Sequence, residues 1–203
     1  MLDLNEFARD VHDNSVRHGW WETDRPLTET LALIHSEWSE ALEEARAGRP
    51  MEWYECAIAK HGVCDFRNTD CKHKNQAKCF SANRNPKPEG IAVELADGCI
   101  RIFDLIGKSP IQMNLTLDEL IDSCPDEVEQ YDISRLVVTL HLCTSVVFDS
   151  LDESWTVDKA SDLLMAVGAA CRWIKHNGCD PEKILRRKHE FNKTRQYKHG
   201  KRF

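Results

Sequence analysis

Apolar side chains recur every three or four residues along most of this 203-residue chain, the spacing that gathers them on one face of an α-helix. No segment shows the sustained alternation of apolar and polar residues that is typical of a half-buried strand. The length suits one domain with a core of its own. We therefore predict a single all-α domain over residues 1–203, built as a helical bundle. The expected helices cover about residues 4–18, 27–47, 91–107, 133–151, 157–176 and 181–195.

Two long stretches interrupt the helical pattern. Residues 50–90 form an insertion rich in cysteine, histidine and lysine, and residues 107–132 form a loop with one short helix. Each is longer than the usual connection in a bundle. We therefore expect each stretch to have a role of its own.

The insertion holds four cysteines with seven, six and seven residues between them, and two histidines among them: Cys56, Cys64, Cys71 and Cys79, with His61 and His73. Four thiolates, or three thiolates and a histidine, can close a tetrahedral site for structural zinc. Such a site would stabilise a polar segment that has little apolar surface to bury. Because the Cys-x-x-Cys pairs of familiar zinc sites are missing, free cysteines and disulfides stay open as alternatives.

Charge and hydropathy narrow the class of protein. The net charge of -7 argues against a dedicated nucleic-acid binder, although the strongly basic C-terminal residues suggest a site for anions. The first ten residues include acids and no apolar run, so we expect no signal peptide and a cytoplasmic protein. No stretch approaches the roughly 18 uninterrupted apolar residues of a membrane helix.

Acidic residues follow one side of two predicted helices. Spacings of three and four residues place Glu37, Glu40 and Glu44 on one stripe, and Glu94 and Asp97 repeat this arrangement in the next helix. If the two helices pack antiparallel, four carboxylates face one another and repel unless cations neutralise them. Such oxygen ligands suit Mg²⁺ or Mn²⁺. The alternative is that these acids are solvated faces of amphipathic helices, paired with arginines.

The last helix and the first turn carry cations, an amide and an aromatic ring. Lys188, Asn192 and Arg195 are spaced four and three residues apart, so they share one helix face and suit phosphate oxygens or a ribose hydroxyl. The alternative is a solvated basic helix end. Trp20 could stack on a nucleobase, or could instead pack in the core.

Three blocks of this sequence resemble the MazG-like all-α nucleoside triphosphate pyrophosphohydrolases, over about half of the chain. They are IHSEWSEALE at residues 34–43, KPEGIAVELAD at residues 87–97, and KHEFNKTR followed by YKHGK at residues 188–201. The family has a glutamate-rich first helix and a Glu-x-x-Asp on the next helix. The sequence departs from the family pattern at Ser36, at Gln196 and in the long insertion.

The resemblance implies a function and a set of site residues. The chain would hydrolyse (deoxy)nucleoside triphosphates to a monophosphate and pyrophosphate with Mg²⁺ or Mn²⁺, in clean-up or regulation of the nucleotide pool. The metal ligands would be Glu37, Glu40, Glu94 and Asp97, with Glu37 and Glu40 also catalytic. The alternatives are a zinc-stabilised binding module for nucleic acid or protein, and a catalytically degenerate regulator that binds nucleotides.

A weak internal echo relates the two halves of the chain. Residues 30–35 resemble residues 135–141, and residues 98–102 resemble residues 170–174, but the second copy lacks the acids. One interpretation is a duplicated helix pair that kept its packing role and lost its chemistry, and the other is a chance likeness. Bundles of this type commonly oligomerise, so we expect a homodimer, unless a duplicated chain already supplies a dimer-like unit.

Overall fold

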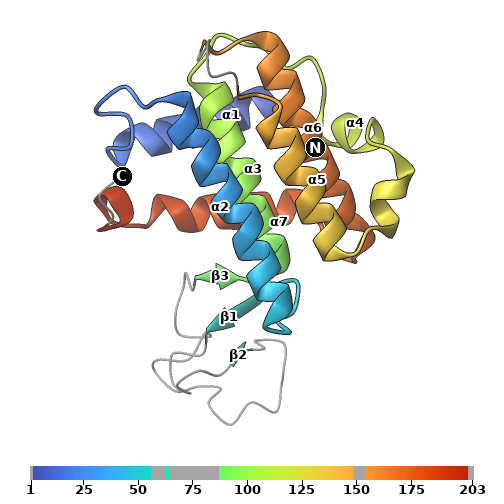
Figure 1. Cartoon of the computed structure of the whole chain (residues 1–203). Helices are drawn as coiled ribbons and strands as arrows, with labels where there is room; N and C mark the ends of the chain where they lie inside the picture. Colours follow the sequence, from blue (N-terminus) through green and yellow to red (C-terminus); the bar gives the residue numbers. More distant parts are fainter. Residues whose placement is uncertain (1, 56–62, 65–86, 149–153, 201–203) are drawn as a thin grey trace.

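The computed structural model describes residues 2–55, 63–64, 87–148 and 154–200, and this part of the chain confirms the all-α prediction (Figure 1). Each expected helix is present, and the loop at residues 107–132 contains a short one. The α-helices are α1 (Leu4–Arg17), α2 (Leu27–Arg46), α3 (Ile91–Gly107), α4 (Leu117–Asp122), α5 (Ile133–Ser145), α6 (Val157–His176) and α7 (Pro181–Lys193). Two 3₁₀ helices, η1 and η2, cover Asp126–Gln130 and Tyr197–Gly200.

Three very short strands form the stem of the insertion. β1 (Trp53–Glu55) pairs antiparallel with both β2 (Val63–Cys64) and β3 (Pro88–Glu89), at the lower end of the molecule in Figure 1. Strands of two or three residues are too short to show an alternating pattern, so they could not be predicted from the sequence. Cys64 belongs to β2, whereas Cys56, Cys71 and Cys79 lie outside the described residues. The zinc site therefore stays a prediction.

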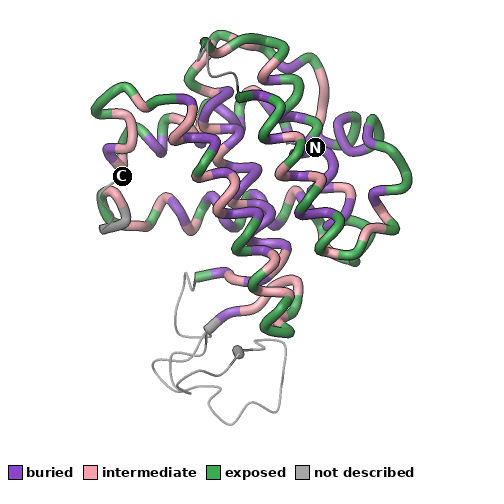
Figure 2. The backbone as a smooth tube through the Cα atoms, in the orientation of Figure 1, coloured by how far each residue is buried: buried purple, intermediate pink, exposed green. Residues whose placement is uncertain are grey.

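Helix α3 forms the centre of the bundle. It packs against α1, α2, α6 and α7, and most of its length is buried (Figure 2). Its apolar residues occupy every side of the helix, as expected for a helix that is covered all round. The acids of α3 are therefore held in a rigid environment, because core side chains are closely packed.

Side-chain caps fix where several helices begin. The carboxylates of Asp3, Asp132 and Asp180 each accept a hydrogen bond from the backbone N–H three residues later. The prediction was wrong at the end of α5, which stops at Ser145 rather than near residue 151. The apolar pattern continues past this point because Val147 is buried in the core although it lies outside the helix.

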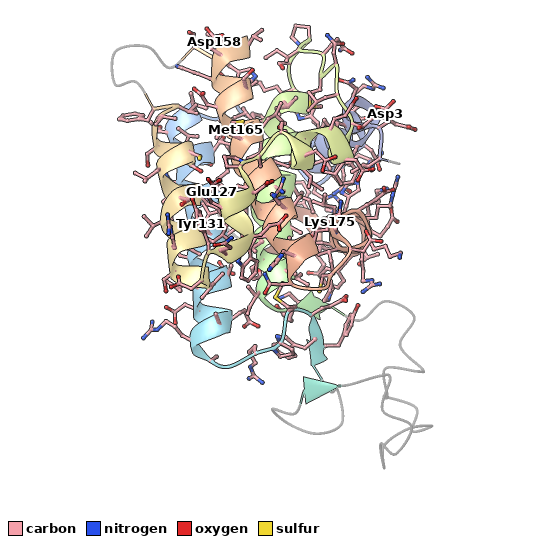
Figure 3. All side chains as sticks on the ribbon, turned by 90° about the vertical axis from the view of Figure 1, so that its right-hand side faces the viewer. Asp3, Glu127, Tyr131, Asp158, Met165 and Lys175 are labelled. Carbon is pink, nitrogen blue, oxygen red and sulfur yellow. The ribbon has the colours of Figure 1, made fainter. Side chains whose placement is uncertain are left out.

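The segment between α3 and α5 packs on α6. Arg172 of α6 donates hydrogen bonds to the backbone carbonyls of Ile121 (3.2 Å) and Cys124 (3.0 Å), and Trp173 donates to the carbonyl of Tyr131 (2.8 Å). Figure 3 views the molecule from this side, with Tyr131 labelled beside α6. The segment thus covers one face of α6.

No helix of the described residues is both long and apolar enough to cross a membrane.

The two halves of the internal echo lie side by side in space. α2 packs on α5, and α3 packs on α6. The rings of His35 and His141 stack with centroids 4.9 Å apart, and Cys99 is hydrogen-bonded to Cys171. Each of these pairs joins a residue to its counterpart in the sequence echo. Contact between equivalent residues is the pattern of a two-fold arrangement, and it favours the interpretation of a duplicated helix pair.

Candidate functional site

A glycine lets α2 and α3 approach closely where their acids meet. The fully buried indole of Trp38 lies against Gly98, and a Cβ atom at position 98 would be only 2.2 Å from Cζ3 of the indole. Any larger residue at position 98 would therefore push the helices apart or displace the ring. Because Glu37 precedes Trp38 and Asp97 precedes Gly98, this close contact also brings the two carboxylates together.

The structure brings together three of the four predicted metal ligands. Glu37, Glu94 and Asp97 each offer a carboxylate oxygen, and these oxygens all lie within 4.8 Å of one another. Glu37 and Glu94 are only 4% and 5% exposed. Glu40 lines the same pocket but is exposed and stands outside this group of three. The buried set of three is what the structure adds to the prediction from helix spacing.

Two cations and one amide bind these acids directly. Nε and Nη2 of Arg101 both lie 2.6 Å from Oε1 of Glu37. Nζ of Lys188, which is 2% exposed, lies 3.2 Å from Oδ2 of Asp97 and 3.8 Å from Oε2 of Glu94. Nδ2 of Asn192 donates to Oδ1 of Asp97 over 3.1 Å. Two of the three predicted phosphate-binding residues, Lys188 and Asn192, therefore contact the acids themselves. Arg195 lies beyond the end of α7, so it does not share the helix face of the other two, but it lines the pocket.

Burial sets the ionisation of the acidic cluster. It raises the pKa of Glu37 to about 7, and the neighbouring charge of Asp97 adds to this shift. Burial also raises the pKa of Glu94 to about 8, although Lys188 opposes the shift. Burial acts against ionisation of Asp97 too, but Lys188, Arg101 and other partners outweigh it and lower the pKa. The cluster thus retains protons near neutral pH in the absence of further cations.

A divalent cation fits this donor set. Three carboxylates face two cationic side chains, so one negative charge is left uncompensated when all three acids are ionised. Carboxylate oxygens are the ligands that Mg²⁺ and Mn²⁺ prefer. Binding of such an ion would displace the protons that burial places on Glu37 and Glu94. The residues present therefore suit a magnesium or manganese site.

The cluster lies in a pocket with mixed charge. The walls come from α2, α3, α7, the turn after α1 and the stem of the insertion, and they include four acids and four cations: Glu37, Glu40, Glu94 and Asp97, with Lys87, Arg101, Lys188 and Arg195. Trp20 also lines this pocket. All the predicted site residues outside the cysteine-rich insertion therefore lie at or beside one pocket.

The turn after α1 is held against the end of α7. The backbone N–H of Lys198 donates to the carbonyl of His18 over 3.0 Å, and Nε2 of His18 lies 2.9 Å from the carbonyl of Arg195. Gly19 has a positive φ of 79°, and a Cβ atom there would lie 2.4 Å from the ring of Tyr197. These contacts place Arg195 and Trp20 on the same side of the pocket.

Two wall residues were missed as site residues by the sequence analysis. Arg101 lies four residues after Asp97, so helix spacing alone indicates that it shares the face of the acids. Lys87 pairs with Glu89 and reaches the pocket from the end of the insertion. No local pattern predicts the position of Lys87, because it depends on how the insertion stem packs against the bundle.

Comparison with known proteins adds no relative. The chain matches no family model, and neither a curated protein nor a solved structure matches it. The resemblance to MazG-like enzymes thus stays a prediction. The function has to be argued from the site, because an all-α bundle supports many unrelated activities.

Proposed function

We propose that this protein is a MazG-like pyrophosphohydrolase that cleaves (deoxy)nucleoside triphosphates to a monophosphate and pyrophosphate with Mg²⁺ or Mn²⁺. The observation that carries the proposal is the group of three carboxylate oxygens within 4.8 Å of one another, in a pocket that also presents four cations. Acids suit the metal, and the cations suit the phosphates of the substrate. Clean-up or regulation of the nucleotide pool is the role that we assign to this activity.

Each side chain has a role that follows from its position. Glu37, Glu94 and Asp97 would hold the divalent cation, with Glu40 at the exposed side of the pocket as a fourth ligand. A divalent cation supplies Lewis acidity toward phosphate oxygens. Glu37 and Glu40 are the candidates to accept a proton from the attacking water.

The cations and the aromatic ring would hold the substrate. Lys188 is paired with Asp97 and Glu94, so it can neutralise the cluster while a phosphate approaches. Arg195 and Lys87 line the pocket and are placed to bind phosphate oxygens. Cζ of Arg25 lies 5.3 Å from the centroid of the Trp20 ring. One face of the Trp20 ring is a candidate for base stacking.

Product analysis tests the reaction directly. The purified chain is incubated with each common NTP and dNTP, with Mg²⁺ or with EDTA, and the products are separated. We expect monophosphate and pyrophosphate, formed only when metal is present. Release of inorganic phosphate instead of pyrophosphate, or equal rates in EDTA, would contradict the proposal. Nucleotide binding without any turnover would point to the degenerate regulator, and neither binding nor turnover would point to the binding module.

A further inference from the structure

A second cavity borders the pocket that holds the acids. It lies between α1, α3 and α7, and it shares Trp20, Asp97, Arg101 and Arg195 with the first pocket. We call it the α7 cavity. A ligand whose phosphates lie at the acids therefore has a neighbouring space in which its nucleoside can be held.

Two buried polar atoms of α7 lack a partner in this cavity. Among the described residues, no group hydrogen-bonds to Oδ1 of Asn192 or to Nδ1 of His189. The two residues are 8% and 2% exposed, and both line the α7 cavity. They are three residues apart in one helix, so they share a face. A buried polar group left unpaired destabilises the fold, and such groups call for an explanation.

Both unpaired atoms are hydrogen-bond acceptors. Nδ2 of Asn192 donates to Asp97, and the reverse orientation of the amide would set an oxygen against the carboxylate. Nε2 of His189 lies 3.0 Å from Oδ2 of Asp10, which can only accept, so the ring proton is on Nε2 and Nδ1 has a lone pair. Burial lowers the pKa of His189 and keeps the ring neutral.

Three donors around the cavity are engaged with acids, and Arg195 is the residue proposed above to bind phosphate oxygens. Nε of Arg25 lies 2.8 Å from Oε1 of Glu29. The hydroxyl of Ser15 donates to Asp104 over 2.7 Å, and the guanidinium of Arg101 is bound to Glu37. The buried unpaired side-chain atoms of this cavity, among the described residues, are thus two acceptors, three residues apart, and they call for a ligand group with two N–H or O–H donors.

We propose that the α7 cavity binds the base of the substrate and selects bases that present an exocyclic amino group, as cytosine and adenine do. This inference rests on the proposed function. One amino group carries two N–H donors and can satisfy both Asn192 and His189. Uracil, thymine and hypoxanthine present a carbonyl oxygen at the corresponding position, which would face two acceptors. A sugar hydroxyl is a second source of donors, and it offers only one hydrogen.

The test compares matched ligands that differ only in the group concerned. Binding of CMP and UMP to the full chain is measured by calorimetry, and kcat/KM is measured for the pairs CTP with UTP and ATP with ITP. We expect the amino-bearing member of each pair to be favoured at least about tenfold, because the carbonyl analogue leaves the buried acceptors unpaired. Equal binding of CMP and UMP would overturn the inference.

A substitution in the wall tests which atoms discriminate. His189→Phe removes the Nδ1 acceptor and retains a ring next to Phe7, which now packs edge-on against His189 at 5.4 Å. We expect the CMP-to-UMP preference to fall several-fold, whereas His176→Phe, on the exposed end of α6, leaves it unchanged. A preference that survives His189→Phe in a folded variant contradicts the assignment. Comparing CMP with its 3′-deoxy form does not depend on any variant.

The outcomes separate this inference from the proposed function. Hydrolysis without preference for amino-bearing bases overturns the assignment of the α7 cavity but supports the proposed reaction. Preference for CMP over UMP without hydrolysis of any triphosphate overturns the proposed reaction but supports base selection by the α7 cavity. If removal of the 3′-hydroxyl abolishes the preference for CMP, the sugar supplies the donor and base selection is overturned.

Discussion

The helix pairs α2–α3 and α5–α6 have equivalent histidines and cysteines where the two pairs meet, but they differ in their acidic residues. When His35 is aligned with His141 and Cys99 with Cys171, the four acids of the first pair fall opposite uncharged residues of the second: Cys143 for Glu37, Val146 for Glu40, Ala166 for Glu94 and Ala169 for Asp97. The aligned histidines and cysteines contact one another across the interface between the pairs. The packing positions are therefore common to both pairs, and the acids belong to one.

This difference shows that packing does not require the acids. Two carboxylates of the first pair have raised pKa values because they are buried, so in the ionised state they destabilise the fold. The second pair makes corresponding helix contacts with small or apolar side chains and carries no such cost. Because burial acts against the ionised forms of Glu37 and Glu94, stability gives no reason to retain these two acids beside Asp97, and their presence points to a function.

The largest expected effect separates the two pairs by activity. Glu37→Gln removes a metal ligand without changing the size of the side chain, and we expect turnover of triphosphates to fall at least about 100-fold. Cys143→Ser changes the corresponding position of the second pair, and we expect turnover within about twofold of the unchanged protein. Rates at saturating Mg²⁺ measure the contrast. Far-UV circular dichroism shows whether both variants remain helical.

Two outcomes would break this contrast. Near-normal turnover in Glu37→Gln would remove Glu37 from the metal site. A loss of turnover in Cys143→Ser comparable to that in Glu37→Gln would mean that the second pair also takes part in the reaction, against the interpretation that it has only a packing role.

The same contrast shows what the sequence could predict. The helices, and the common face of Glu94 and Asp97, follow from local spacing, which a single sequence displays directly. The contact of Trp38 with Gly98 could not be foreseen, because it depends on which helices pair and at what depth. His189 was missed because it lies in a strongly basic stretch that reads as a solvated surface, although packing against α1 buries it. The homodimer and the zinc site stay predictions.

The second effect is a pH dependence of stability that arises from Glu37 and Glu94 of the helix pair α2–α3. The pKa values of Glu37 and Glu94 are about 7 and about 8 in the folded protein, above the ordinary 4.5. Between pH 4.5 and about 8, the folded state therefore binds more protons than the unfolded state. The free energy of unfolding of the metal-free protein should therefore fall as pH rises through this window, by at most about 1.4 kcal/mol per pH unit for each proton.

Histidines act in the opposite direction and at lower pH. Burial lowers the pKa values of His35, His141 and His189 below the ordinary 6.5, so their contribution is complete only about one pH unit above 6.5 and is lost as pH falls. Urea unfolding between about pH 7.5 and 8.5 thus isolates the acids. We expect the free energy of unfolding to fall less steeply with pH in Glu94→Gln and as steeply as in the unchanged protein in Cys143→Ser. Saturating Mg²⁺ should abolish the fall. An unchanged slope in Glu94→Gln would refute the buried-acid explanation.

The third expected effect concerns the close contact that assembles the acids. Gly98→Ala adds a Cβ atom 2.2 Å from the buried indole of Trp38, and overpacking of this kind costs about 1–3 kcal/mol of unfolding free energy. The counterpart change, Ala170→Gly in α6, should cost about 1 kcal/mol through helix propensity. Both values are measurable by urea unfolding at fixed pH. Turnover should fall in Gly98→Ala and stay unchanged in Ala170→Gly, because only the first substitution separates Glu37 from Asp97.

A second substitution distinguishes crowding from any other effect of the added methyl group. Trp38→Phe shortens the ring that the new Cβ atom meets, so the double variant Gly98→Ala with Trp38→Phe should lose less stability than the two single changes added together. Additive losses would mean that the indole already moves aside in Gly98→Ala. In that case the distance between α2 and α3 is set elsewhere, and the acids do not owe their proximity to Gly98.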